Sequence, residues 1–199
     1  MPDEHFTELL ADRIALRRFT PADLTTFVAY RSDPDVARYQ GWDAPYSLAD
    51  GERMISRLLE THPDTAGEWF QYAMVLRSTN ELIGDCASGT DEQDPRLAEI
   101  GFTVRPEYHG QGYATEGTRA LLGYLFQARA KHRVTARCDP RNAPSARVLE
   151  RLGMRREGLL RESEWAKGEW ADELCYAILD REWAAQGVPG ARLAGPGPG

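Results

Sequence analysis

The sequence contains few cysteines, and they lack the spacing of a metal site or a disulfide framework. Cys86, Cys138 and Cys175 each lie in a separate apolar, strand-like stretch, and none belongs to a C-x-x-C pair. Cysteines in such surroundings are usually reduced thiols inside a cytosolic protein. The four histidines are scattered as well, without ligand spacing. We therefore expect no metal.

Long apolar runs are also absent. No stretch approaches the roughly 20 apolar residues that a membrane-spanning helix needs. The first ten residues, MPDEHFTELL, are acidic and contain no apolar core of a signal peptide. These features predict a cytoplasmic protein that has no membrane partner.

Positive charge is in deficit, because 24 Lys and Arg residues stand against 31 Asp and Glu residues, a formal charge of −7. This deficit argues against nucleic acid as a partner, since nucleic-acid binding depends on Lys and Arg facing phosphates. It would suit a cationic partner, although charge alone does not identify one. The length of 199 residues, with 42% hydrophobic and 28% charged residues, fits one soluble domain.

No internal repeat or second domain is visible, so we expect one domain over 1–186 and a disordered Gly- and Pro-rich tail over 187–199. Alternating apolar residues predict strands at 13–19, 69–77, 82–88, 97–104, 134–138, 154–165 and 170–179. Helical spacing predicts helices near 21–31, 35–39, 48–61, 113–129 and 142–153. Short connections favour antiparallel neighbours, while the helix between 97–104 and 134–138 makes those two strands parallel. The fold class is therefore mixed α/β, a mostly antiparallel sheet with one parallel pair, flanked by helices.

The segment 105–120, RPEYHGQGYATEGTRA, is the centre of this arrangement. A strand leads into Gly110 and Gly112, and a helix follows. Glycine lets a ligand approach the main chain, and the free N–H groups and dipole of a helix start favour an anion. The glycines alone fit a phosphate site and a simple helix start equally well. Thr115 replaces the third glycine of a dinucleotide fingerprint, and no G-K-[ST] of a P-loop is present.

Two motifs in order resemble the GNAT superfamily of acetyl-coenzyme A-dependent N-acetyltransferases. HGQGYA, residues 109–114, resembles its [QR]-x-x-G-x-[GA] pyrophosphate loop. The second motif, N-x-x-S-x-x-V-x-x-x-L-G-[FM], is matched by Asn142, Ser145, Val148, Leu152, Gly153 and Met154. RIALRRFTPADL near the start and GEWADELCYAIL near the end are similar to the RimJ/RimL branch, which acetylates protein N-termini. The resemblance covers roughly residues 12–183.

The resemblance implies acetyl-CoA as co-substrate. It places the coenzyme contacts at Phe102, Val104, His109, Gly110, Gln111, Gly112, Tyr113, Ala114, Thr115, Asn142 and Arg147. His109 departs from the usual Gln or Arg, but its ring can still donate a hydrogen bond. Many members place a tyrosine acid seven residues after the motif asparagine, where this chain has Leu149. The RimJ/RimL branch instead has a serine at the position of Ser145.

Acetyl transfer needs a base for the amine and stabilisation of the leaving thiolate. Glu99 is the expected base, because its uncharged strand face would raise its pKa. A plain exposed acid or an arginine partner is an equal alternative. Ser145 is the expected thiolate partner, with a helix-start role as its alternative. Asn142 fits a helix cap equally well, and Arg147 fits an ordinary surface residue.

Trp42 and Tyr46 lie where the family builds its acceptor pocket, although aromatics at such places are as often core. The predicted function is acetyl transfer from acetyl-CoA to a primary amine by direct attack in a ternary complex. The acceptor we expect is the α-amine of a peptide or protein N-terminus. Alternatives are a small amine, such as an antibiotic, polyamine or amino acid, or a non-catalytic acyl-CoA sensor. A homodimer is a possible assembly.

Overall fold

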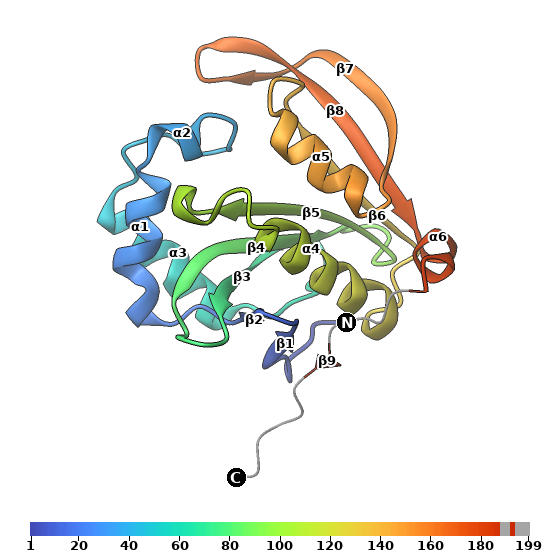
Figure 1. Cartoon of the computed structure of the whole chain (residues 1–199), viewed down its shortest axis with the longest axis horizontal. Helices are drawn as coiled ribbons and strands as arrows, with labels where there is room; N and C mark the ends of the chain where they lie inside the picture. The colour runs from blue at the N-terminus through green and yellow to red at the C-terminus, as the bar shows by residue number, and fades with distance from the viewer. Residues whose placement is uncertain (188–191, 194–199) are drawn as a thin grey trace.

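A computed structural model describes residues 1–187 and 192–193, so most of the tail expected to be disordered lies outside the described residues. The chain forms, in order, β1 (Glu8–Leu10), β2 (Ile14–Arg17), the 3-10 turn η1 (Pro21–Asp23), α1 (Leu24–Arg31), α2 (Pro34–Ala37), α3 (Leu48–Glu60), β3 (Trp69–Leu76), β4 (Leu82–Thr90) and β5 (Leu97–Val104). It continues with the 3-10 turn η2 (Pro106–Tyr108), α4 (Tyr113–Gly123), the π-helical turn η3 (Tyr124–Ala128), β6 (Arg133–Cys138), α5 (Ala143–Arg151), β7 (Arg155–Ala166), β8 (Glu169–Leu179), α6 (Asp180–Ala185) and β9 (Arg192–Leu193). Figure 1 shows their arrangement.

Within the described residues these strands form one sheet in the order β7-β8-β6-β5-β4-β3-β2-β1-β9. All neighbours are antiparallel except β5 and β6, which are parallel, as the sequence predicted. The parallel ladder runs from Leu97–Arg133 to Ile100–Ala136 and stops there. The remaining residues of β5 therefore have no ladder partner on the β6 side, and the sheet opens at this point.

Helices cover the two faces of the sheet. Gly117 of α4 lies against Cys86 of β4, whereas Tyr30 of α1 hydrogen-bonds to Asp85, the preceding residue. Because successive side chains of a strand point to opposite faces, α4 and α1 lie on opposite sides. Figure 1 shows α5 beside α4, and α3 beside α1. The core runs through both layers, and it includes Tyr72, Leu121 and Leu149.

Several boundaries differ from the sequence prediction. The three-residue β1 and the short α6 were not predicted, because such brief segments carry no clear periodicity. The helix expected to reach residue 129 ends at Gly123, and η3 continues it. In the part of the chain that the structure describes, every helix is too short or too polar to span a membrane.

Candidate active site

The glycine loop between β5 and α4 has the backbone that an anion site requires. Gly110 and Gly112 have φ values of 75° and 86°, in the left-handed region that glycine adopts without strain. Gly112 is the N-cap of α4, and the first helical hydrogen bond comes from the N–H of Glu116. The N–H groups of the preceding residues therefore remain available. A Cβ on Gly110 would meet no atom within 4 Å, so the loop faces open space.

Arg13, the residue just before β2, fixes this loop from the side. Its guanidinium pairs with Glu116 of α4 at 2.7 Å and donates to the carbonyl oxygen of Gln111 at 3.1 Å. It also lies 4.4 Å from the centre of the Tyr113 ring. The Glu116 carboxylate accepts the backbone N–H of Arg13 as well, at 2.6 Å. Sequence reasoning missed this pair, because about 100 residues separate its members.

A cleft of about 730 Å³ lies in front of the loop, between β5, α4 and α5; we call it the loop cleft. It brings together most of the residues expected to contact the coenzyme, namely Phe102, Val104, His109, Gly110, Gly112, Tyr113, Ala114, Thr115, Asn142 and Arg147. Gln111 is not among its lining residues; its side chain donates to the carbonyl oxygen of Glu107. Tyr39, Gln40 and Tyr108 also line the cleft, although no motif or periodicity pointed to them.

His109 is held by its own strand. Its ring nitrogen Nε2 lies 2.7 Å from the carbonyl oxygen of Val104. A carbonyl can only accept, so Nε2 must carry the proton and donate it. The ring therefore ties the loop to the end of β5, and Nδ1 is the nitrogen left for a ligand.

The second motif forms the opposite wall of the loop cleft. Asn142 caps α5 by accepting the backbone N–H of Ser145 at 3.2 Å, so its structural role is present. The side chain of Ser145 lines the cleft. Arg147 lines it too, together with Arg141 and Arg151. This wall therefore carries one serine and three arginines, of which Arg141 is paired with Asp139 and Glu169, each at 2.6 Å.

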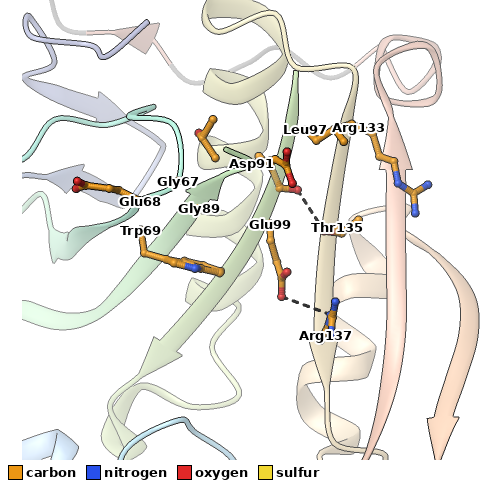
Figure 2. A pocket seen from close by; sticks show the side chains of 12 residues that line it. Gly67, Glu68, Trp69, Gly89, Asp91, Leu97, Glu99, Arg133, Thr135 and Arg137 are labelled. Atoms are coloured by element: carbon orange, nitrogen blue, oxygen red, sulfur yellow. Dashed lines mark hydrogen bonds and ion pairs between the residues drawn. The ribbon is translucent and has the colours of Figure 1, made fainter. Parts of the chain in front are cut away.

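Glu99 lies on the other face of the sheet. It is opposite Gly89 of β4 and Thr135 of β6, one residue before the parallel ladder ends. It lines a separate hollow of about 310 Å³, the Glu99 hollow, shown in Figure 2. Its Oε1 is 3.8 Å from Nε of Arg137. Glu99 thus has the arginine partner that was the alternative to a role as base, and it also faces a cavity, as a base would have to.

The surroundings of Glu99 favour its neutral form. Burial raises the pKa of its carboxyl above the ordinary value, Arg137 opposes that rise, and Glu173 adds to it. Arg137 also pairs with Glu173 at 3.4 Å, so one guanidinium serves two carboxylates. A carboxyl with a raised pKa that faces a cavity is suited to general base catalysis near neutral pH.

A third cavity of about 560 Å³, the hairpin groove, lies between the segment after α2 and the β7–β8 hairpin. It shares Arg137 with the Glu99 hollow, and it shares Tyr39, Gln40 and Arg141 with the loop cleft. The three cavities therefore adjoin one another around the end of the parallel ladder. The hairpin turn bridges the groove, because Lys167 pairs with Asp43 at 2.9 Å and bonds to the carbonyl oxygen of Trp42.

The structure places Trp42 and Tyr46 outside the residues that line these three cavities. Both pack around Arg31, which is only 2% exposed. The Trp42 ring lies 3.9 Å from its guanidinium, and the indole N–H donates to its backbone oxygen at 3.1 Å. Tyr46 lies 5.3 Å from the same guanidinium. Their contact with an acceptor remains a prediction.

The site joins an anion cradle on one face of the sheet to a carboxylate on the other. The β5–β6 ladder ends one residue after Glu99, so both parts of the site lie near the point where these strands stop pairing. Among residues 1–187 and 192–193, no group of three or more His, Cys, Asp or Glu is placed to hold a metal ion.

Comparisons with known proteins identify the family. The model of the acetyltransferase (GNAT) domain family matches residues 13–155. The uncharacterized N-acetyltransferase p20 of Bacillus licheniformis is 30% identical over 176 residues, covering 88% of this chain and 98% of its own. The crystal structure of a GNAT-family acetyltransferase from Bacillus anthracis is 31% identical with a TM-score of 0.79, covering 88% of this chain and 99% of its own.

One further relative and one solved structure of similar fold carry names that state an acceptor. The [ribosomal protein uS5]-alanine N-acetyltransferase of Escherichia coli (strain K12) is 27% identical over 118 residues, which is 59% of this chain and 61% of its own. The spermidine N-acetyltransferase of Vibrio cholerae, solved with CoA and spermine, is 22% identical with a TM-score of 0.73, covering 86% and 98% of the two chains. That structure shares the fold. The chain thus belongs to the GNAT acetyltransferase family and is an acetyl-CoA-dependent N-acetyltransferase of the RimJ/RimL-like kind.

Proposed function

We propose that this enzyme acetylates the free α-amine of a peptide or protein N-terminus. Acetyl-CoA would lie in the loop cleft, with its pyrophosphate on the N–H groups that follow Gly110 and Gly112. The backbone of Phe102 and Val104, past the end of the parallel ladder, would hold its pantetheine arm. The amine would attack the thioester directly from the face that carries Glu99. Arg147, with Arg141 and Arg151 beside it, would meet the coenzyme's remaining phosphate.

The observation that carries this proposal is the placement of Glu99, a half-buried carboxyl with a raised pKa beside the opening of the sheet. An α-amine has a pKa near ~8, against roughly 10.4 for a lysine side chain, so a modest base suffices for it. Glu99 would take the proton of the attacking amine, directly or through water.

Ser145 would act on the leaving group. Ser145 lines the loop cleft, and its hydroxyl would face the thiol end of the coenzyme. An O–H donor there stabilises the thiolate as the carbon–sulfur bond breaks. Leu149, at the place of the usual tyrosine, is buried in the core and has no proton to give.

A small amine is the second candidate acceptor. The E. coli relative is named for an alanine acceptor on a ribosomal protein, and the V. cholerae structure for spermidine, so both acceptor classes occur among the similar proteins. The carboxylates of the hairpin groove, among them Glu164 and Asp172, would suit either cationic acceptor.

A direct competition tests the proposal. Release of free CoA thiol and gain of mass are measured with short peptides, N-acetylated control peptides containing lysine, spermidine and an aminoglycoside. Peptides with a free α-amine should give the highest kcat/KM, and blocking that amine should abolish the reaction. A wide preference for a small amine would overturn the α-amine assignment. Coenzyme binding without thiol release from any acceptor would instead favour the sensor alternative.

A further inference from the structure

The Glu99 hollow contains more than the transfer reaction requires. Besides Glu99 and Arg137, its lining includes Trp69 of β3, Gly89 of β4 and Leu97 of β5. Figure 2 shows Trp69 reaching from β3 across β4 toward the side of Glu99. Acetyl transfer itself requires no aromatic side chain at this place, so the presence of Trp69 in the hollow needs another explanation.

The ring of Trp69 packs against Gly89 of β4. Strand pairing puts Trp69, Gly89 and Glu99 in one row on the same face of the sheet. A Cβ on Gly89 would come within 2.7 Å of the indole ring, so a larger residue would displace the ring from β4. Trp69 is nevertheless 42% exposed. The ring is therefore held against the strand by one face while much of its surface stays open.

The position of this platform relative to Glu99 is informative. The hairpin groove meets the Glu99 hollow at Arg137, so an acceptor entering along the groove brings its nitrogen to Glu99 with Trp69 lying beyond it. An amine at the end of a methylene chain has nothing beyond its nitrogen. An α-amine carries a side chain on the adjacent carbon, and that side chain needs a place close to the base.

We propose that the Glu99 hollow binds the first side chain of the acceptor, and that Trp69 selects a large apolar side chain such as leucine or methionine over glycine. This inference rests on the proposed α-amine function and deepens it. The indole and Leu97 supply apolar contact surface, while Glu68 and Asp91 at the rim oppose an acidic side chain. Arg133, the other cation of the lining, is engaged by Glu157 at 2.5 Å.

The test compares peptides that differ only in the first residue, with glycine, alanine, leucine, methionine or glutamate. Steady-state kinetics are measured for the wild type, for Trp69→Ala, and for Gly89→Ala, whose Cβ displaces the ring. Trp170→Ala is the matched control, because Trp170 is an exposed tryptophan of β8 that lines none of the three cavities. Circular dichroism and melting curves confirm that each variant is folded.

The wild type and Trp170→Ala should favour leucine over glycine about tenfold in kcat/KM, mainly through KM. Trp69→Ala and Gly89→Ala should reduce that ratio to within about threefold, mainly by lowering kcat/KM for the leucine peptide. Equal discrimination in the wild type and Trp69→Ala would overturn the pocket while leaving the α-amine function intact. Failure of every peptide, with turnover of a small amine, would instead overturn the α-amine function and the inference with it.

Discussion

At the scale of single residues, the site depends on small groups whose neighbours fix their roles. Gly112 has a backbone that side chains rarely adopt, and a Cβ there would lie 3.5 Å from the Arg13 guanidinium. Burial raises the pKa of the Glu99 carboxyl, and Arg137 opposes that rise. Ser145 combines a place in the helix start with a hydroxyl in the cleft. Each of these roles can be separated by substitution.

Gly112→Glu should abolish coenzyme binding, because a carboxylate would occupy the phosphate seat. Acetyl-CoA should raise the Tm of the wild type by mass action, and this rise should vanish in the variant. Gly112→Ala is the control, since it introduces the backbone strain of about 1 kcal/mol without the negative charge. It should lower the Tm but keep most of the coenzyme-dependent rise. An intact rise in Gly112→Glu would contradict the loop assignment.

Glu99→Gln should slow transfer about 10²-fold or more in the pH range between the raised carboxyl pKa and the amine pKa near ~8. Below that range the wild type also loses its base, because the Glu99 carboxyl takes up a proton. Above it the amine is already neutral, so the difference should shrink. The measurement is the pH profile of kcat/KM for both proteins. Coincident profiles would leave Glu99 as an ordinary strand residue.

Ser145→Ala should lower kcat while leaving the affinity for acetyl-CoA nearly unchanged, because the hydroxyl is needed only as the thiolate leaves. The expected loss is roughly tenfold to a hundredfold, as for one donor at a developing charge. Ser145→Thr keeps a hydroxyl and should retain more activity. Single-turnover rates and coenzyme titrations separate the two effects, and an unaffected kcat would reduce Ser145 to its role in the helix start.

At the scale of elements, the segment from β5 to α5 was largely predictable from the sequence. The strand at 97–104 was predicted with the boundaries it has, because alternation and the following glycines define it locally. The loop cleft followed from the same segment, since its residues are close in sequence. Arg13, Trp69 and Arg137 could not be found this way. Their roles arise from strand order and register, which bring distant segments together after the local pattern is fixed.

The Arg13–Glu116 pair offers a test of how β2 supports the loop. Glu116→Ala removes the acceptor for the Arg13 side chain and backbone, so it should destabilise the fold by roughly 1–3 kcal/mol and raise the Kd of acetyl-CoA. Glu157→Ala, which breaks the exposed pair with Arg133, should cost at most about 1 kcal/mol and leave the Kd unchanged. Urea unfolding and coenzyme titration provide the measurements. Equal behaviour of the two variants would argue against an anchoring role.

At the scale of the whole molecule, a buried ionic cluster joins parts of the chain that are far apart in sequence, and its Thr90 also lines the Glu99 hollow. Lys131 is buried and bonds to the carboxylate of Asp64 and to the hydroxyl of Thr90. Asp64 also accepts from Arg129 at 2.9 Å. The cluster links the loop before β3, the end of β4 and the loop before β6. Lys131 also donates to the carbonyl oxygen of Pro95, just before β5, at 2.6 Å, so the cluster holds together the ends of the strands that carry Trp69, Glu99 and Arg137.

Lys131→Met should destabilise the protein by about 3 kcal/mol, because it leaves the buried Asp64 with one of its two cations. Lys167→Met removes an exposed pair of the hairpin turn and should cost about 1 kcal/mol or less. Chemical denaturation compares the two. A Lys131→Met protein as stable as the wild type would show that the buried pair contributes no net stability.

The early end of the β5–β6 ladder also affects how substrates enter the enzyme and how products leave it. Under the proposed assignment, the gap between these two strands lets acetyl-CoA approach from one face of the sheet and the acceptor from the other. Only the acetyl group has to pass between the strands, and each product can leave by the route along which its substrate entered. An acceptor of any length, including the end of a folded protein, can then be served, because its body never passes through the sheet.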